Sequence, residues 1–522
     1  MVDLFPAGSP YAAYLKFAIP ALAILLIVVH GCFGSRRLKA PRAIVAALFF
    51  LSAVLAMNEY VRGNLRDGLW LNGYEFYHYY IGAKYERELG YTNMYNATLA
   101  ADAEAKRRMV KQVRDLDSGR VVAARQQLKG REAHKTLFSE ARWKEFATDV
   151  AFFRERVSFG QWQQQLRDKG YNGTPAWTML GSAFATLVPT GSRSGMQALV
   201  LIDVFLVVAA FACTWRAFGH RSACLLIVFL GAHYLMSHNT LRAAFIRLDW
   251  IACLVMSISM LKLGHDRTAG ALAAWAAISR IFPAIFLYGI VAKLAYDAAV
   301  SRTINRRCIN FLGAFVVAFA VFLFYSAVVT GGFGSWIEFF DKVGRHNQDI
   351  SAWRIGFKYV FLMTFENQNY WGVDAKTFFD SHQIIWWSIQ LTVLGACFMA
   401  TRRLELHEAF AFGFVPAYFF FSPTFYYYVF LLVPIQFFAG RMNRPFGAIG
   451  LIYVFATGMM GHVFFGWWGR GYKLFFVMSC LMGVLALYML FVALMQPNRP
   501  TAKSAPGEEP DCIDPVTPGV PA

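Results

Sequence analysis

The run FLGAFVVAFAVFLFYSAVV, residues 311–329, contains no charged side chain. A helix needs roughly 20 apolar residues to cross the ~30 Å hydrocarbon layer of a bilayer, and this run meets that length. Similar runs recur along the chain, and their unbroken apolarity favours helices over the alternating pattern of a membrane β-barrel. The sequence therefore predicts an all-α, polytopic integral membrane protein.

The composition of the chain supports the same class. Of the 522 residues, 57% are hydrophobic and only 16% are charged, which is too apolar for an ordinary soluble domain. The formal net charge of +18 raises the question of nucleic-acid binding. However, no basic block interleaved with aromatic residues lies in a polar segment, so we expect no nucleic-acid partner.

Hydropathy and the placement of cations predict a bundle of about 12–13 transmembrane helices. Arg36 and Arg37 follow the first span and mark that loop as cytoplasmic, so the second span exits to the outer side. The expected parts are two spans in residues 1–58, a large extracytoplasmic segment in 59–190, a transmembrane core in 191–495 with a second extracytoplasmic loop at 331–383, and a disordered cytoplasmic tail in 496–522.

Three local patterns give finer expectations within these parts. Polar residues with helical spacing predict a helical insertion at 101–156, and the short apolar stretch at 174–189 predicts a re-entrant or interfacial helix. The sequence SRIFP at 279–283 interrupts an apolar run, and its proline predicts two short helices rather than one span. The spacing of the cysteines predicts neither a disulfide framework nor a structural metal site.

A carboxylate lies among aromatic rings in the sequence NGYEFYHYY, residues 72–80, where the chain leaves the second span. Partial desolvation at such a place raises the pKa of a carboxyl group, so Glu75 could accept a proton near neutral pH. The alternative is an interfacial aromatic belt with one solvated glutamate.

Further ionisable residues gather next to spans on the same predicted side. Charges close to a bilayer are costly, so they tend to face a cavity, where arginines can hold a phosphate while apolar grooves take a lipid tail. Internal ion pairs and cations that extend to the interface are the alternatives. The predicted substrate-binding residues, with rings for a sugar face and a histidine to orient Glu75 or a hydroxyl, are Tyr74, Tyr77, His78, Arg242, Arg247, Asp249, Arg280, Arg345, His346 and Arg354.

The order of these patterns resembles that of GT-C glycosyltransferases, nearest to the family 87 type, which takes mannose or a related sugar from a polyprenyl phosphate. Residues 72–95 resemble the first external loop of that family. Four later stretches follow in the same order: TPAW at 174–177 with Pro189, RLDW at 247–250, SRIFP at 279–283 and FSP at 421–423. The chain departs from the family at Glu75, usually Asp, at Arg280, usually Lys, and in its larger first loop.

The resemblance implies a GT-C-like bundle and an inverting transfer of a mannose-like sugar or a pentose to an extracytoplasmic acceptor. Glu75 would be the general base, and the enzyme would lie in the inner (cytoplasmic) membrane of a bacterium with its active site on the extracytoplasmic side. The acceptor, whether glycan, lipid or protein, stays open. So does assistance by a divalent metal ion, for which no ligand is assigned.

Two other classes of function compete with this interpretation. A transporter or flippase for lipid-linked sugars would use the same cations and rings, but transporters usually carry internal repeats, and the sequence has no convincing repeat. A scaffold subunit without activity would explain the insertion at 101–156 as a partner-binding segment. The cluster around Glu75 argues against that last class.

Overall fold

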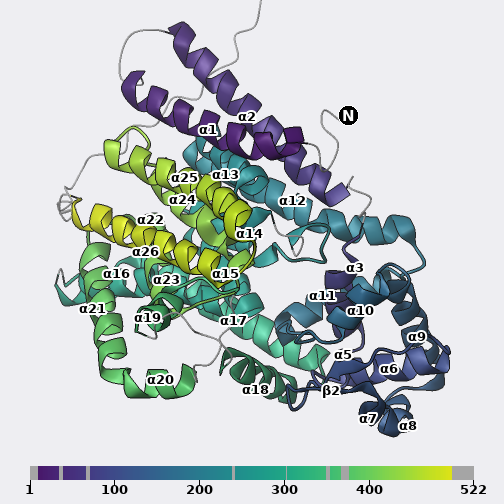
Figure 1. Ribbon diagram of the computed structural model, residues 1–522. Coiled ribbons are helices and arrows are strands. Elements are labelled where there is room, and N and C mark those ends of the chain that lie inside the picture. The colour runs from purple at the N-terminus through teal and green to yellow at the C-terminus, as the bar shows by residue number, and fades with distance from the viewer. Residues whose placement is uncertain are drawn as a thin grey trace, which may run out of the picture.

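The computed structural model describes residues 10–33, 39–65, 71–237, 241–300, 302–348, 353–365 and 375–496. Nearly all of its secondary structure is helical (Figure 1). The exception is one antiparallel hairpin of β1 (Gln112–Arg114) and β2 (Val121–Ala123). The predicted all-α class is confirmed, whereas the predicted disordered tail lies beyond residue 496, outside the described residues.

Eight helical segments among the described residues are long and apolar enough to cross a membrane. Exposed apolar side chains such as Val316, Val321 and Phe324 cover their outer faces, as expected for contact with lipid. The protein is therefore a multi-pass membrane protein. The eight are α1 (Pro10–Phe33), α2 (Lys39–Leu65), α12 (Arg193–Phe218), η5 with α16 (Phe282–Phe286 and Leu287–Ala299), α17 (Arg306–Val329), α21 (Gln383–Thr401), α25 (Pro445–Trp468) and α26 (Tyr472–Leu494).

The other apolar runs that contribute to the predicted 12–13 spans form shorter helices. Most of their side chains are buried against neighbouring helices. A helix enclosed by protein need not match the bilayer thickness, because other helices cover its ends. These elements are α13 (His220–Ala232), α14 (Asp249–Lys262), α15 (Asp266–Arg280), α22 (Leu406–Ala411) with α23 (Phe414–Phe420), and η7 (Phe425–Leu431) with α24 (Leu432–Ala439).

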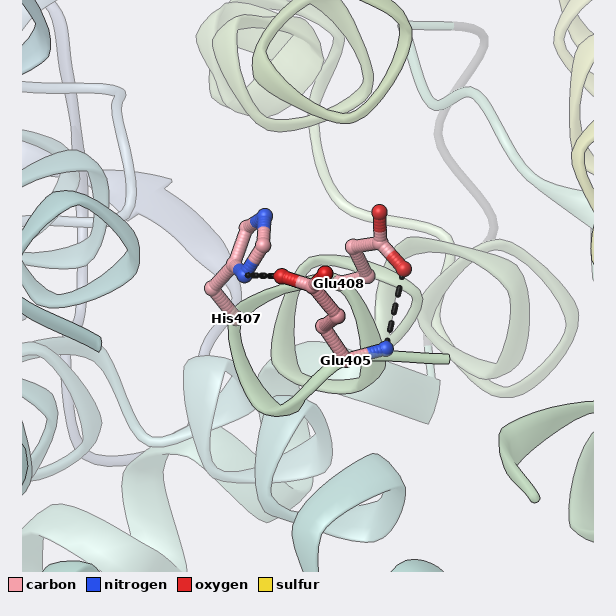
Figure 2. A group of neighbouring side chains, drawn as sticks. All are labelled: Glu405, His407 and Glu408. Atoms are coloured by element: carbon pink, nitrogen blue, oxygen red, sulfur yellow. Dashed lines mark hydrogen bonds and ion pairs between the residues drawn. The ribbon is translucent and has the colours of Figure 1, made fainter. Parts of the chain in front are cut away.

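The first turn of α22 carries three neighbouring ionisable side chains (Figure 2). Glu405 precedes the helix, and its backbone N–H donates to Glu408 over 2.9 Å, which forms a capping box. Glu408 also pairs with Arg441 at 2.8 Å, and His407 Nδ1 lies 3.3 Å from Glu405. The pair with Arg441 balances the charge of Glu408 at the start of α22.

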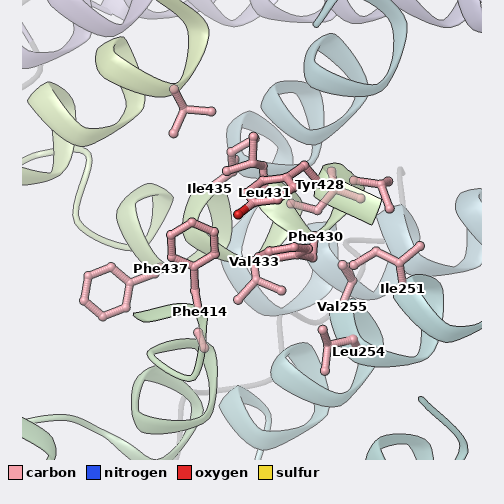
Figure 3. Packing of buried hydrophobic residues seen from close by; sticks show 14 of the residues in the cluster. Ile251, Leu254, Val255, Phe414, Tyr428, Phe430, Leu431, Val433, Ile435 and Phe437 are labelled. Carbon is pink, nitrogen blue, oxygen red and sulfur yellow. The ribbon is translucent and has the colours of Figure 1, made fainter. Parts of the chain in front are cut away.

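Apolar side chains from α14, α23, η7 and α24 form the centre of the membrane bundle (Figure 3). Ile251 and Val255 face Phe430 and Val433 there, and all four are buried. Elsewhere two helices approach so closely that only glycine fits. A Cβ on Gly270 of α15 would lie 2.2 Å from the Phe311 carbonyl oxygen of α17.

Residues 71–190 form a group of short helices beside the long ones, at the lower right of Figure 1. They share a second apolar core rich in aromatic rings. The helices are α3 (Gly73–Phe76), η1 (Tyr77–Ile81), α4 (Gly82–Lys84), α5 (Glu86–Leu89), α6 (Met94–Glu104), α7 (Ala124–Gln127), η2 (Leu128–Gly130), α8 (Arg131–Lys135), α9 (Glu140–Arg154), α10 (Phe159–Gln165) and α11 (Pro175–Leu187).

The prediction of a helical insertion at 101–156 is wrong for its middle part. Residues 112–123 form the β1–β2 hairpin, whose turn is stabilised by the Ser118 hydroxyl donating to Asp115 over 2.6 Å. Gly119 follows with φ of +72°, a conformation that glycine adopts without strain. Local turn chemistry therefore overrides the helical spacing of the polar residues.

A helix at 174–189 and a break near 279–283 are confirmed. The re-entrant or interfacial position of the first helix stays a prediction, and the segment after the break is long enough to cross a membrane. The stretch at 174–189 is a helix, α11, capped by Thr174, whose hydroxyl accepts from the Trp177 N–H over 3.1 Å. The run at 268–296 breaks at Ile281, where φ is +59°.

The remaining helices are η3 (Tyr234–Met236), α18 (Gly334–Gln348), α19 (Phe357–Phe365) and α20 (Ala375–Ser381).

Candidate functional site

Glu75 is positioned by a short helix that begins at Asn72. The Asn72 side-chain oxygen accepts from the Glu75 N–H over 3.3 Å and so caps α3. The Asn72 backbone N–H donates to the Ala243 carbonyl oxygen over 2.9 Å. The capping residue thus ties the Glu75 segment directly to the loop that precedes α14.

The helix then widens into the π-helix η1, which carries four consecutive aromatic or imidazole rings. A π-turn holds more residues than an α-turn, and π-turns often mark functional sites. All four rings are buried, and each has a separate polar partner. Tyr77 bonds to Thr98 (2.7 Å), His78 to the Tyr74 carbonyl (3.0 Å) and the Tyr95 hydroxyl (2.8 Å), Tyr79 to Asn172 (2.5 Å) and Tyr80 to the Val188 carbonyl (2.7 Å).

The second part of the site is the loop at 241–248. Ala243 and Ile246 have φ values of +47° and +48°, which are strained for residues with a side chain. Asp203 of α12 stabilises this loop, because its carboxylate accepts the backbone N–H groups of Arg247 and Leu248, each over 2.9 Å. The loop thereby directs Arg247 toward η1.

Arg247 is the closest cation to Glu75. Its Nη2 lies 3.5 Å from Glu75 Oε2, and its guanidinium carbon lies 4.3 Å from the centre of the Tyr79 ring and 5.5 Å from that of Tyr426. Only 3% of the Arg247 side chain is exposed. Its Nη1 is buried without a hydrogen-bond partner among the described residues. One edge of this guanidinium therefore carries an unused N–H donor.

A second buried guanidinium, that of Arg280, lies at the end of α15. Its carbon is 5.8 Å from the Tyr79 ring centre and 5.7 Å from that of Trp177. Its Nη2 is 3.9 Å from Asp249 Oδ1, too long for a hydrogen bond. Nε and Nη2 have no hydrogen-bond partner in the described part of the chain. Tyr79 therefore lies close to two cations with unused donors.

Asp249 is held by neighbouring donors rather than by either arginine. Its Oδ2 accepts from the Ser279 hydroxyl over 2.7 Å and from the Trp275 indole N–H over 3.0 Å. These bonds join the start of α14 to the last turns of α15. Asp249 thus fixes the helix end from which Arg280 projects.

Burial raises the pKa of Glu75 to about 7. Arg247 and Arg280 lower it and Asp168 raises it, but desolvation is the largest of these effects. The carboxyl group therefore exchanges a proton near neutral pH. A buried donor without an acceptor costs roughly 1–3 kcal/mol, so an anionic oxygen that met the free N–H groups of the two arginines would be stabilised here.

The structure brings four of the predicted residues together, namely Glu75, Arg247, Asp249 and Arg280. The other predicted residues have contacts elsewhere or are only partly described. Tyr74 donates to Asp168 (2.9 Å), the Arg242 carbonyl accepts from Asn72 (3.3 Å), Arg345 donates to the Asp117 carbonyl (2.5 Å), Arg354 forms an isolated β-bridge with Thr424, and His346 lies on α18 with its side chain outside the described part.

Arg345 lies in a different place from Arg247. It lines a pocket between α18 and the hairpin together with Glu338 and Asp341. Tyr77 and His78 point into the core of residues 71–190, where both ring nitrogens of His78 already have partners. Neither Tyr77, which is fully buried, nor His78 has a described hydrogen bond to Glu75.

Sequence patterns alone do not distinguish Tyr79, Asp203 and Tyr426 as site residues. Asp203 is a carboxylate inside an otherwise apolar run, and such a residue indicates function or a structural role by itself. Tyr79 belongs to the quoted aromatic stretch, but only the geometry of η1 distinguishes it from its neighbours. Tyr426 comes into place because residues 353–355 pair with residues 423–425.

One group of described side chains has the composition of a metal site. The ligating atoms of Glu405, His407 and Glu408 lie within 4.8 Å of one another (Figure 2). However, Glu408 is paired with Arg441, and Glu405 lies 3.4 Å from Lys262. A cation would have to displace these two basic side chains, so we interpret the group as a helix cap with ion pairs.

Comparisons with family models, with curated proteins and with solved structures find no match to this chain. The geometry around Glu75 and the two buried arginines is therefore the basis for the function proposed below.

Proposed function

We propose that this chain is an inverting membrane glycosyltransferase of GT-C type. It moves a mannose-like sugar or a pentose from a polyprenyl-phosphate donor to an extracytoplasmic acceptor. One observation carries the proposal. Glu75, a buried carboxyl with a pKa of about 7, lies 3.5 Å from the buried guanidinium of Arg247, which has an unused donor.

The chemistry assigned to these side chains is a single displacement. Glu75 takes the proton of the acceptor hydroxyl while the hydroxyl oxygen attacks the anomeric carbon of the sugar. The bond from that carbon to the phosphate oxygen breaks, and the phosphate leaves on its lipid with the electron pair. Arg247 and Arg280 donate N–H groups to the leaving phosphate, where negative charge develops.

Aromatic rings next to the arginines suit a sugar substrate. Tyr79 lies near both guanidiniums, and Trp177 lies near Arg280. A ring face can stack on the apolar face of a sugar. In this proposal Tyr79 and Trp177 take the stacking role, because their rings lie beside the two guanidiniums, whereas no such contact joins Tyr77 to either arginine in the described part of the chain.

The proposed topology places residues 59–190 outside the cytoplasm as the insertion after the second span, in the inner membrane of a bacterium. Lys262, Arg307 and Arg441 lie at helix ends remote from Glu75 and contact acidic residues of the same region. Cations accumulate on the cytoplasmic side of membrane proteins. The opposite ends of these helices, with Glu75, are therefore assigned to the outer side.

The test is transfer of a labelled sugar by the purified chain from a panel of polyprenyl-phosphate donors. Glu75→Gln should lower the transfer rate by about a hundredfold or more, because it removes the base while keeping the side-chain shape. Full activity in this variant would rule out the mechanism. Movement of the intact donor across the bilayer without transfer would favour a transporter instead.

Glu86 provides a matched control for this experiment. It is also buried, and burial and the neighbouring Glu338 raise its pKa to about 7. No described contact joins it to Arg247 or Arg280. Glu86→Gln should therefore retain transfer activity, which separates the loss of the base from the general effect of neutralising a buried carboxyl in this part of the fold.

A further inference from the structure

A second polar pocket lies at the far end of the bundle from Glu75. It has a volume of about 350 Å³. α14 links the two places, since it begins at Asp249 in the candidate site and ends at Lys262 in this pocket, about 20 Å of helix away. The lining residues are His30, Ala217, Phe218, Gly219, His220, Arg221, Ser222, Lys262, Ala439, Gly440, Met442 and Asn443.

The ionisable residues that line this pocket are basic or imidazole side chains, without a carboxylate among them. His30 Nε2 lies 2.6 Å from the Asn443 side-chain oxygen, which can only accept, so this nitrogen carries the proton. Arg221 Nη1 lies 3.2 Å from His30 Nδ1 and 3.3 Å from His30 Nε2, and with the proton on Nε2 it is Nδ1 that accepts. A neutral imidazole therefore orients the arginine without cancelling its charge.

The positive charge of Arg221 has no acidic partner in the described part of the chain, and its Nε is buried without a hydrogen bond. Lys262, also in the lining, lies 3.4 Å from Glu405, which belongs to the group in Figure 2. The other carboxylate of that group, Glu408, is paired with Arg441. The nearby acids are thus occupied, and the pocket keeps a positive potential.

Backbone groups add to this potential. α13 begins at His220, and its N-cap Gly219 supplies no side-chain hydrogen bond to the first turn. The N–H groups of a helix first turn are unsatisfied within the helix and favour an anion, as does the helix dipole. This turn carries Arg221 and lines the pocket, so the backbone and the side chain attract the same kind of ligand.

We propose that this pocket binds a phosphate group, either in the headgroup of an anionic membrane lipid or in a soluble phosphate ester. The Arg221 guanidinium and the first N–H groups of α13 donate to its oxygens. This site is separate from the one around Glu75 and takes no part in the proposed sugar transfer. Exposed Trp215 near the end of α12 places the pocket close to the level of lipid headgroups.

Three variants of the full-length chain test the assignment. Arg221→Gln removes the central donor and should weaken phosphate binding about tenfold or more. His220→Glu places a carboxylate at the first turn of α13, where it occupies the anion site and favours the helix. It should abolish binding without loss of thermal stability, so the proposal stays testable even if Arg221→Gln folds poorly.

Arg216→Gln is the matched control, because Arg216 is an exposed cation in the last turn of α12 outside the pocket lining. The chain is purified in a neutral detergent and titrated with phosphatidylglycerol, with glycerol 3-phosphate and with inorganic phosphate, and melting temperature is followed. A saturable rise with the lipid alone assigns a headgroup, and a rise with the soluble phosphates assigns a phosphate ester.

In either case the rise should be lost in Arg221→Gln and in His220→Glu and kept in Arg216→Gln. The proposal is overturned if none of the three ligands gives a saturable rise. It is equally overturned if Arg216→Gln weakens binding as much as Arg221→Gln does, since attraction would then be due to general surface charge. Loss of sugar transfer in Glu75→Gln leaves this outcome unaffected.

Discussion

At the scale of single residues, two buried carboxyl groups have a similarly raised pKa but different charged neighbours. Desolvation is the largest cause for both Glu75 and Glu86. The next contribution differs, since Arg247 lowers the pKa of Glu75 while Glu338 raises that of Glu86. Of the two, Glu75 is the one whose cationic neighbours, Arg247 and Arg280, are buried guanidiniums with unused donors.

Glu75 should make the stability of the protein depend on pH. Its pKa is about 7 in the folded chain against an ordinary 4.5, so between these values the folded state binds more protons than the unfolded state. Stability thus falls as pH rises through this window, by about 3 kcal/mol in total. The melting temperature of Glu75→Gln minus that of the parent chain should rise between about pH 5 and about pH 8.

Glu86→Gln should show a trend of the same sign, because its pKa is also raised to about 7. The two effects should be nearly additive in the double variant, since no described contact joins the two side chains. A flat difference between Glu75→Gln and the parent chain across this pH range would mean that Glu75 is not desolvated.

Sequence alone could predict Glu75, Arg247, Asp249 and Arg280 as a group, because a charge next to an apolar run is costly and tends to have a function. It could not separate them from Arg345, which contacts the hairpin instead. That distinction depends on where loops far apart in the chain meet. The support of Arg247 by Asp203 likewise depends on the packing of α12 against the loop at 241–248.

At the scale of helices, close packing depends on glycines whose missing side chain lets two backbones approach. Gly270 of α15 contacts α17 in this way. One of these helices, α15, ends at Arg280 in the candidate site. A change in their separation would therefore also displace this guanidinium.

Gly270→Ala should destabilise the protein, because the new Cβ would lie 2.2 Å from the Phe311 carbonyl oxygen and 3.0 Å from the Phe315 nitrogen. Backbone atoms cannot move aside as a flexible side chain can. Overpacking of this kind typically costs about 1–3 kcal/mol. Thermal unfolding of the purified chain in detergent measures the loss.

Gly313 on α17 is the control, because a Cβ there would meet nothing within 4 Å. Gly313→Ala should leave stability unchanged or raise it by up to about 1 kcal/mol through helix propensity. Equal melting temperatures for the two variants would contradict the close approach of α15 and α17.

The sequence largely predicts which segments form helices. It does not always predict where each helix ends. The break at Ile281 follows from Pro283, which cannot continue the hydrogen-bond ladder of a helix. The sequence does not predict the hairpin at 112–123, because its polar residues also have helical spacing. Eight of the predicted 12–13 spans are long enough to cross a membrane among the described residues, and hydropathy does not show whether a shorter apolar helix faces lipid or, like α14, other helices.

At the scale of the whole molecule, the second core is not confined to residues 71–190. It includes Phe245 and Ile246 from the loop before α14 and Trp336 and Phe339 from α18. Phe245 lies 5.3 Å from Phe76 and 5.7 Å from Trp177, measured between ring centroids. The short helices around Glu75 therefore depend on the membrane bundle for part of their core.

A soluble fragment of residues 71–190 should consequently fail to fold cooperatively. It would expose the aromatic surface that Phe245, Trp336 and Phe339 cover in the full chain, and small domains have little stability to spare. Circular dichroism during heating should show a broad, non-cooperative change. A sharp transition in the isolated fragment would show instead that this unit is independent of the bundle.

The π-helix at Tyr77–Ile81 limits how this segment can change during evolution. Four successive side chains point toward four different neighbours. None of these positions faces solvent, and each side chain makes a contact of its own. Deletion of one residue would return the stretch to ordinary α-helical spacing. Every ring after the deletion would then point to a different neighbour. Substitutions are therefore expected in the residues around this segment, while the number of residues in the π-helix stays constant.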